Sequence, residues 1–186
     1  LRLAREGAHV VLADIQRPPQ ELPPDEVQAG WRGIESVAQE IRALGQRALP
    51  LVTDITQSAQ VDRLVETTVR EMGGIDILVN NARAIIGRDQ ALVVDLEENE
   101  WDRVMAVNAK GTFLCSRAVA RYLVREDRRG KIINIASSAA FLVRAGIPYS
   151  IYAMTKAGVV MLTKALAEEW SRFNINVNAV APGYFL

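Results

Sequence analysis

The sequence predicts an α/β fold in which a doubly wound parallel sheet is covered by helices on both faces, giving three layers. Short apolar runs alternate with longer amphipathic runs, which is the pattern of strands connected by crossover helices. The short runs are rich in Val, Ile and Leu and mostly lack polar alternation, as expected of strands buried on both faces. Glycines follow several helical runs just before a strand, where helix ends favour a residue that tolerates left-handed backbone angles.

The expected elements follow one another in the order that this fold requires. Strands are expected at His9–Ala13, Ala48–Thr53, Ile75–Val79, Lys131–Ile135 and Asn176–Val180. Helices are expected near residues 33–44, 57–72, 98–124 and 151–172. The chain opens inside a helix, whereas a doubly wound sheet begins with a strand and a glycine-rich turn. We therefore expect one domain over residues 1–186, incomplete at both ends, whose first strand and glycine-rich phosphate-binding loop are absent.

Residues 15–33 interrupt this pattern after the first expected strand. They contain four of the seven prolines, and proline fixes φ and lacks a backbone donor. The segment is therefore predicted to be an inserted surface loop. An excursion without function is one interpretation, and a flap that covers a ligand is the other.

Composition limits the classes of partner. The 186 residues are 49% hydrophobic, which suits one globular domain, and 22 basic residues balance 22 acidic ones. With no net charge, we expect neither a nucleic acid nor a membrane surface as partner. The single cysteine, Cys115, excludes an internal disulfide and favours a reducing compartment, the cytoplasm. His9 is the only histidine, so no metal site is expected, and no apolar run approaches the ~18 residues of a membrane span.

Residues 149–158, YSIYAMTKAG, place two tyrosines ahead of one lysine. Side chains four residues apart lie on the same helix face, so Tyr152 meets Lys156 and Tyr149 does not. A phenol beside an ammonium is biased toward its phenolate, which makes it a proton donor usable near neutral pH. Taken alone, such a pair is also an ordinary solvated helix face.

Two small hydroxyls end the apolar run Ile132–Ser138. Enzymes with parallel sheets place functional groups at the carboxyl ends of strands, so Ser137 and Ser138 are candidates. A simple turn or helix cap is the competing interpretation of both serines.

A strand with a terminal serine followed by Y-x-x-x-K resembles the short-chain dehydrogenase/reductase family. Further family-like segments stand in order along essentially the whole chain: Asp14, TDI at 53–55, LVNNA at 78–82, VNAKG at 107–111 and APG at 181–183. The resemblance implies a Rossmann fold in which residues 1–186 form one dinucleotide-binding and catalytic domain. It also implies an oxidoreductase that interconverts a small alcohol and a carbonyl compound with NAD.

The resemblance assigns four catalytic residues. Tyr152 would be the general acid/base, and Lys156 would lower the pKa of Tyr152 and hold the nicotinamide ribose. Ser138 would hydrogen-bond the substrate oxygen, and Asn108 would anchor a water in the proton relay. Ser137 stays an alternative to Ser138, because Phe141 stands where the family has a glycine. An Asn108 that faces solvent is the alternative for that residue.

The resemblance also assigns the cofactor contacts. Asp14 would accept hydrogen bonds from the adenosine ribose and repel a 2′-phosphate, which favours NAD over NADP, although Arg17 would soften that repulsion. The further contacts would be made by Asp54, Ile55, Asn81, Ala82, Tyr152, Lys156, Pro182 and Gly183. The competing interpretations are that Asp14 starts a turn and that Asp54 caps the helix near Gln57.

One residue departs from the family pattern N-N-A-G. Arg83 replaces the glycine, which lets backbone come close to a cofactor. Arg83 supports the first alternative function, a catalytically silent NAD-binding or scaffold protein. The second alternative is an NADP-linked 3-oxoacyl-carrier reductase.

The two longest expected helices indicate assembly. Residues 103–124 and 152–170 carry apolar side chains on more than one face, which calls for more cover than one sheet provides. Family members pair these helices, so a homodimer or homotetramer is expected, and core packing within a monomer is the alternative. The resemblance places the substrate pocket among Phe141, Arg144, Ile147 and Tyr149.

Overall fold

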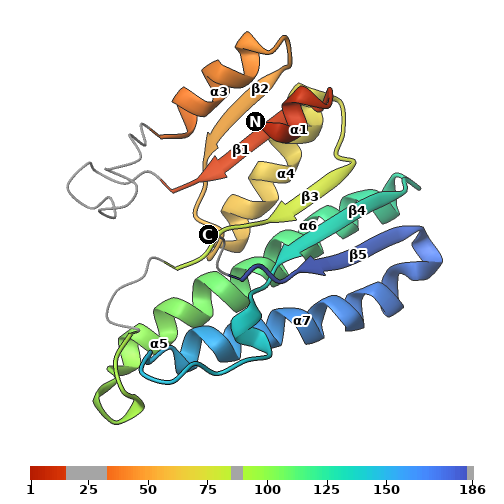
Figure 1. The fold of residues 1–186 in the computed structure, drawn as a ribbon. Coiled ribbons are helices and arrows are strands. Elements are labelled where there is room, and N and C mark those ends of the chain that lie inside the picture. The colour runs from red at the N-terminus through yellow and green to blue at the C-terminus, as the bar shows by residue number, and fades with distance from the viewer. Residues whose placement is uncertain (16–32, 85–89, 184–186) are drawn as a thin grey trace. The chain divides into compact units, whose positions relative to one another are not determined.

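The computed structural model describes residues 1–15, 33–84 and 90–183 (Figure 1). The proline-bearing insertion predicted for 15–33 lies outside these residues, apart from its first and last positions. The chain forms two compact units. The first combines Leu1–Asp54 with Ala59–Gly74, and the second combines Ile55–Ser58 with Ile75–Leu186.

The first unit is built on two parallel strands. Its elements are α1 (Arg2–Arg5), β1 (Val10–Asp14), α3 (Ile34–Ala43), β2 (Ala48–Val52) and α4 (Ser58–Met72). The strands pair in register, and α3 packs against both of them through its buried Ala38 and Ile41. Gly45 and Gly73 end α3 and α4 with φ values of 81° and 87°, as the sequence predicts for helix ends.

The second unit contains a three-stranded parallel sheet in the order β3-β4-β5 (Figure 1). Its strands are β3 (Ile77–Asn80), β4 (Gly130–Ile135) and β5 (Ile175–Val180). Its longer helical elements are α5 (Glu98–Val104), the π-helix η3 (Met105–Gly111), α6 (Thr112–Arg125) and α7 (Ser150–Trp170). Its short 3-10 turns are η2 (Val93–Asp95), η4 (Ser138–Ala140) and η5 (Ser171–Phe173).

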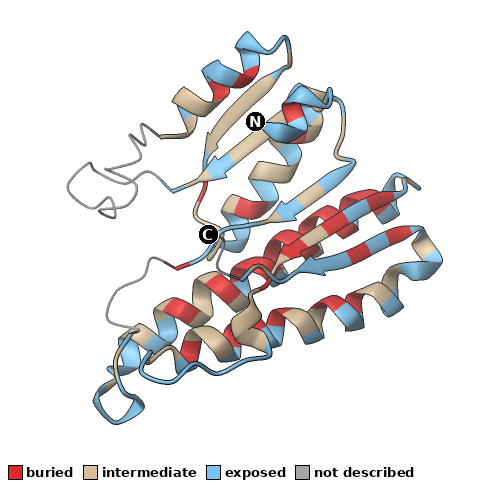
Figure 2. Ribbon diagram, in the orientation of Figure 1, coloured by how far each residue is buried: buried red, intermediate tan, exposed pale blue. Residues whose placement is uncertain are grey.

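The core of the second unit lies between this sheet and two helices. Helix α6 packs against β3 and β4, and α7 packs against β4 and β5. Buried residues gather on β4, α6 and the inward side of α7 (Figure 2). The contact between α6 and β4 is close, because a Cβ added to Gly130 would lie 2.4 Å from Cδ1 of the fully buried Leu123.

A buried polar network ties the sheet to both helices. Asn80 and Asn134 are direct partners in the register of β3 and β4, and Asn80 Nδ2 donates to Asn134 Oδ1 at 2.8 Å. Asn80 Nδ2 also lies 2.9 Å from Ser116 Oγ on α6, and Asn134 Nδ2 donates to Thr163 Oγ1 on α7 at 2.9 Å. Because buried polar groups need partners, these bonds favour one placement of α7 on β4.

The predicted strands and the parallel pairing are confirmed, with ends shifted by one or two residues. The largest shift is in β3, which begins at Ile77 rather than Ile75, because the chain bends at Gly73 and again at Asp76 before the strand begins. The continuous helix predicted over 98–124 is wrong in detail, because Met105–Gly111 is a π-helix between two α-helical segments. Local π-helical turns are frequent at functional sites, and this one carries Asn108.

Candidate functional site

Tyr152 and Lys156 lie one turn apart at the start of α7. Lys156 is only 4% exposed, and its Nζ lies 5.8 Å from the centroid of the Tyr152 ring. The same Nζ donates a hydrogen bond of 2.6 Å to the carbonyl oxygen of Ile135 at the end of β4. The lysine is therefore fixed between the tyrosine and the carboxyl end of the sheet.

Two causes lower the pKa of Lys156 from its usual 10.5 to about 8. Burial is the larger cause, because it disfavours the charged ammonium, and the positive charge of Arg83 is the second. Perturbed groups of this kind concentrate at functional sites, which supports a functional role for Lys156.

The hydroxyl of Tyr149 forms hydrogen bonds with the backbone of an earlier segment, not with Lys156. It accepts a hydrogen bond of 2.6 Å from the backbone N–H of Arg144 and donates one of 3.2 Å to the carbonyl oxygen of Leu142. Tyr149 lies at the N-cap of α7, outside the helix that carries the Tyr152–Lys156 pair. The structure thus brings Tyr152, and not Tyr149, to the lysine.

The two serines after β4 differ in what their hydroxyls do. Ser137 Oγ accepts a hydrogen bond of 3.2 Å from the N–H of Ala139 and so caps η4. Within the described residues, no hydrogen bond engages Ser138 Oγ. The N–H of Ser138 donates to the carbonyl oxygen of Pro182 at 2.9 Å, and a Cβ added to Gly183 would lie 3.8 Å from Ser138 Oγ. Ser138, Pro182 and Gly183 therefore lie together at the ends of β4 and β5.

Asn108 is buried and links two segments around the tyrosine. It is 1% exposed, so the alternative that it faces solvent is wrong. Its Oδ1 accepts from the N–H of Ala84 at 2.8 Å, and its Nδ2 donates to Thr155 Oγ1 at 3.1 Å. Thr155 Oγ1 in turn donates to the carbonyl oxygen of Tyr152 at 2.8 Å.

Thr155 was missed by the sequence analysis. A threonine three residues after a tyrosine and one before a lysine is ordinary in a helix, where its hydroxyl bonds back to a carbonyl. The available signal was its helical spacing, since residue 155 shares a face with Ile151 and Val159, which are also buried. A polar residue on a buried helix face requires a partner, and here that partner is Asn108.

The segment after β3 carries Asn81, Ala82 and Arg83, all of which are exposed. Among the described non-glycine residues, only Asp127 and Asn174 have positive φ, so Arg83 follows an ordinary backbone path. Its Nη1 lies 3.4 Å from the carbonyl oxygen of Ala84. The arginine therefore occupies the position of the family's glycine without a left-handed backbone.

The remaining candidate residues are divided between the units. Asp14 and Asp54 belong to the first unit, and Ile55 belongs to the second. Asp14 Oδ1 accepts from the N–H of Ile15 at 2.7 Å, so this carboxylate contacts the backbone at the end of β1. Ile55 packs closely on η3, because a Cβ added to Gly111 would lie 2.5 Å from Ile55 Cδ1.

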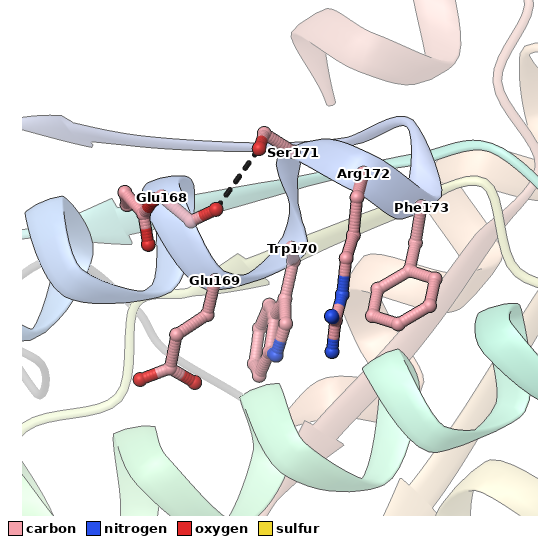
Figure 3. A pocket seen from close by; sticks show the side chains of 6 residues that line it. All are labelled: Glu168, Glu169, Trp170, Ser171, Arg172 and Phe173. Carbon is pink, nitrogen blue, oxygen red and sulfur yellow. Dashed lines mark hydrogen bonds between the residues drawn. The ribbon is translucent and has the colours of Figure 1, made fainter.

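A hollow of about 430 Å³ opens at the other end of α7 (Figure 3). Its lining runs from Glu168 to Phe173, and Ser171 Oγ donates to the carbonyl oxygen of Glu168 at 2.9 Å. The guanidinium of Arg172 stacks 4.8 Å from the Phe173 ring centroid. This hollow is lined by none of the candidate site residues, and it begins 16 residues after Tyr152, about 24 Å along the helix.

Two other kinds of feature are absent from the described residues. No group of three or more His, Cys, Asp or Glu side chains is arranged in them to hold a metal ion. In the same residues, no helix combines the length and the hydropathy needed to cross a bilayer.

The chain matches a known family over its full length. The family described as short chain dehydrogenase matches residues 1–186. The 2-dehydro-3-deoxy-D-gluconate 5-dehydrogenase of Dickeya dadantii (strain 3937) is 44% identical over 182 residues, which is 98% of this chain and 64% of that protein. The chain thus spans less than two thirds of the length of this relative.

Solved structures agree with the sequence match. A gluconate 5-dehydrogenase from Burkholderia cenocepacia J2315, in complex with NADP and tartrate, has a TM-score of 0.80 at 35% identity, over 99% of this chain and 64% of that one. An NAD⁺-bound xylitol dehydrogenase has a TM-score of 0.82 at 32% identity, over 99% of this chain and 64% of that one. These matches confirm the predicted α/β fold of the Rossmann type, and the chain belongs to the short-chain dehydrogenase family.

Proposed function

We propose that the protein is an NAD-dependent oxidoreductase that interconverts an alcohol and a carbonyl compound. The observation that carries this proposal is the buried ammonium of Lys156, which is fixed on Ile135 and held 5.8 Å from the Tyr152 ring centroid. This arrangement places a phenol and an ammonium side by side on one helix face, as the family resemblance implies for a tyrosine that exchanges a proton. A phenol that gains and loses a proton easily is the group that an alcohol-to-carbonyl conversion requires.

In this proposal, the site residues of the second unit have different roles in the reaction. Tyr152 passes the proton to or from the substrate oxygen, and Ser138, whose hydroxyl lies beside Gly183, donates a hydrogen bond to that oxygen. Asn108 is a positioning residue, because its side chain acts on Tyr152 through Thr155. Both polar atoms of the Asn108 side chain are engaged, so a water of the proton relay would bind at its backbone carbonyl, which also accepts from Thr112 Oγ1 at 2.8 Å.

The residues present fit a nicotinamide dinucleotide. Lys156 uses one of its three N–H groups on Ile135, which leaves two for the hydroxyls of a ribose. Gly183 has no side chain facing Ser138, so the end of β5 leaves room for a ring beside the serine hydroxyl. The bound cofactor supplies hydride transfer, and the protein supplies placement and electrostatics. In this proposal, Asn81, Ala82 and Pro182 add contacts to the cofactor, and Ile55 and Asp54 contact its adenine.

The choice of NAD rests on Asp14. A carboxylate at the end of β1 repels a 2′-phosphate and accepts hydrogen bonds from ribose hydroxyls. The two structural relatives described above carry NADP in one case and NAD⁺ in the other, so the family match leaves this choice to the residue itself. Side-by-side kinetics with both cofactors test it. A preference for NADPH would favour the alternative of an NADP-linked 3-oxoacyl-carrier reductase.

The first assay is formation of NADH by the full-length protein on a panel of alcohols. Sugar acids and polyols come first in the panel, because two relatives are named for gluconate derivatives and one for xylitol. Turnover on at least one member supports the proposal. Tight NAD binding without turnover on alcohols or on the matching carbonyl compounds would support the alternative of a catalytically silent NAD-binding protein.

Assembly and compartment belong to the same proposal. Phe113 on α6 and Met161 on α7 are large, exposed apolar side chains, which supports pairing of these helices in a homodimer or homotetramer. Light scattering of the full-length protein tests this assembly. Burial raises the pKa of the Cys115 thiol to about 11, so this thiol is unreactive, which fits a protein of the reducing cytoplasm.

A further inference from the structure

Tyr149 holds the loop that connects the two catalytic segments. This loop, residues 141–149, runs from η4, which begins at Ser138, to α7, which carries Tyr152. The Tyr149 hydroxyl accepts from the N–H of Arg144 at 2.6 Å and donates to the carbonyl oxygen of Leu142 at 3.2 Å. One phenol thus closes the chain on a segment five to seven residues earlier, using its donor and one acceptor position.

The start of the loop is tied to the catalytic serine. The carbonyl oxygen of Ser138 accepts from the N–H groups of Phe141 and Leu142, each at 3.0 Å. The chain then reverses through Gly146, whose φ of 79° is strained for residues with a side chain. The loop is therefore fixed at two points, by the backbone of Ser138 and by the side chain of Tyr149.

The loop presents apolar side chains to solvent. Phe141 is 65% exposed, Leu142 is 60% exposed and Val143 is 91% exposed. Three consecutive exposed apolar residues form an apolar surface of the kind that contacts a ligand or another chain. The loop joins η4 to α7, and these two elements pack against each other, so a ligand that reaches Ser138 and Tyr152 lies near this surface.

We propose that Tyr149 is a positioning residue that sets substrate selectivity by fixing the apolar residues of loop 141–149 beside the reacting group. The inference rests on the proposed oxidoreductase function. It assigns to Tyr149 a role in substrate recognition, whereas Tyr152 transfers the proton. The substrates bound more tightly because of this loop are alcohols or carbonyl compounds with an apolar group next to the reacting carbon.

The test is Tyr149→Phe in the full-length protein, which removes both hydrogen bonds and keeps the ring. Hydrogen exchange of the Arg144 amide should become about tenfold faster, which is the effect of losing one ordinary hydrogen bond. KM for substrates with an apolar group should rise about three- to tenfold, with a smaller change for compact polar substrates and an unchanged Kd for NAD. Tyr122→Phe on α6 is the matched control, because it removes a phenol hydroxyl away from the loop.

Each outcome decides a separate point. Equal hydrogen exchange of the Arg144 amide in the wild type and in Tyr149→Phe, measured against the amides of β4 as an internal reference, would show that the Tyr149 hydroxyl does not fix the loop. Faster exchange with an unchanged ratio of KM values between apolar and polar substrates would overturn the role in selectivity. Wild-type protein without turnover would contradict the proposed function, and the exchange rates would still decide whether Tyr149 fixes the loop.

Discussion

Replacing Lys156 by methionine separates the cost of burying an ammonium from what that ammonium does for Tyr152. Lys156 is 4% exposed, and its pKa is lowered from 10.5 to about 8. That drop corresponds to about 3 kcal/mol, since one pKa unit equals about 1.4 kcal/mol. At pH 7 the folded protein bears this penalty, because the side chain is protonated in both the folded and the unfolded state.

The sign of the pH dependence follows from the lowered pKa. Between about pH 8 and pH 10.5 the unfolded state binds a proton on Lys156 that the folded state has released. The free energy of unfolding of the wild type therefore rises with pH in this window, by up to about 3 kcal/mol from this one group. The contribution is complete above pH 10.5 and is lost as the pH falls through about 8. Methionine has no proton to release, so Lys156→Met lacks this rise.

The substitution also leaves the carbonyl oxygen of Ile135 without the 2.6 Å hydrogen bond from Nζ. This loss costs about 1–3 kcal/mol and does not depend on pH. We therefore expect Lys156→Met to have roughly wild-type stability at pH 7 and to be less stable than the wild type near pH 10.5.

The assay is urea unfolding of both proteins without cofactor at a series of pH values. The difference in free energy of unfolding should change by about 3 kcal/mol across the window, with Lys156→Met relatively more stable at low pH. A difference that stays constant with pH would refute the reasoning, because it would mean that the folded state does not lower the pKa of this lysine.

Two other substitutions test neighbouring parts of the account. Arg83→Gly restores the residue typical of the family and removes a like charge, so the pKa of Lys156 should rise from about 8 part of the way toward 10.5, while Arg83→Lys should leave this pKa low. The pKa is read from the midpoint of the pH-dependent difference in free energy of unfolding between proteins with Lys156 and with Lys156→Met. An unmoved midpoint in Arg83→Gly would contradict the role of Arg83. Gly130→Ala should destabilise the protein by about 1–3 kcal/mol, because its Cβ would lie 2.4 Å from Cδ1 of the buried Leu123. The matched control in urea unfolding is Gly158→Ala in α7, where an added Cβ meets nothing within 4 Å. This control should stabilise the protein by about 0.5–1 kcal/mol. Equal effects of the two alanines would contradict the close packing of Gly130 on Leu123.

The strands and most of the helices could be predicted because their signals are local. Uninterrupted Val, Ile and Leu runs specify strands of a parallel sheet, and the glycines at positions 45 and 73 mark helix ends that need left-handed backbone angles. The π-helix around Asn108 could not be predicted, because a π-helical turn changes the hydrogen bonding from i+4 to i+5 while the apolar pattern continues.

The candidate site was only partly accessible to sequence reasoning. Helical spacing predicted that Tyr152 and Lys156 share a face, because this relation lies within one turn. The link from Asn108 to Thr155 joins residues 47 positions apart, and it depends on how η3 packs against α7. The effect of Arg83 on Lys156 likewise depends on folding that brings the segment after β3 within electrostatic range of Lys156 on α7.

The central claim is that the phenol of Tyr152, held beside Lys156, exchanges a proton with the substrate. The most direct measurement compares kcat and NAD affinity of the full-length wild type with those of Tyr152→Phe, using Tyr122→Phe as the control for loss of a phenol elsewhere. The account predicts that kcat falls by about 10²–10⁴-fold in Tyr152→Phe while the Kd for NAD stays within about twofold. Turnover by Tyr152→Phe at the wild-type rate would contradict it.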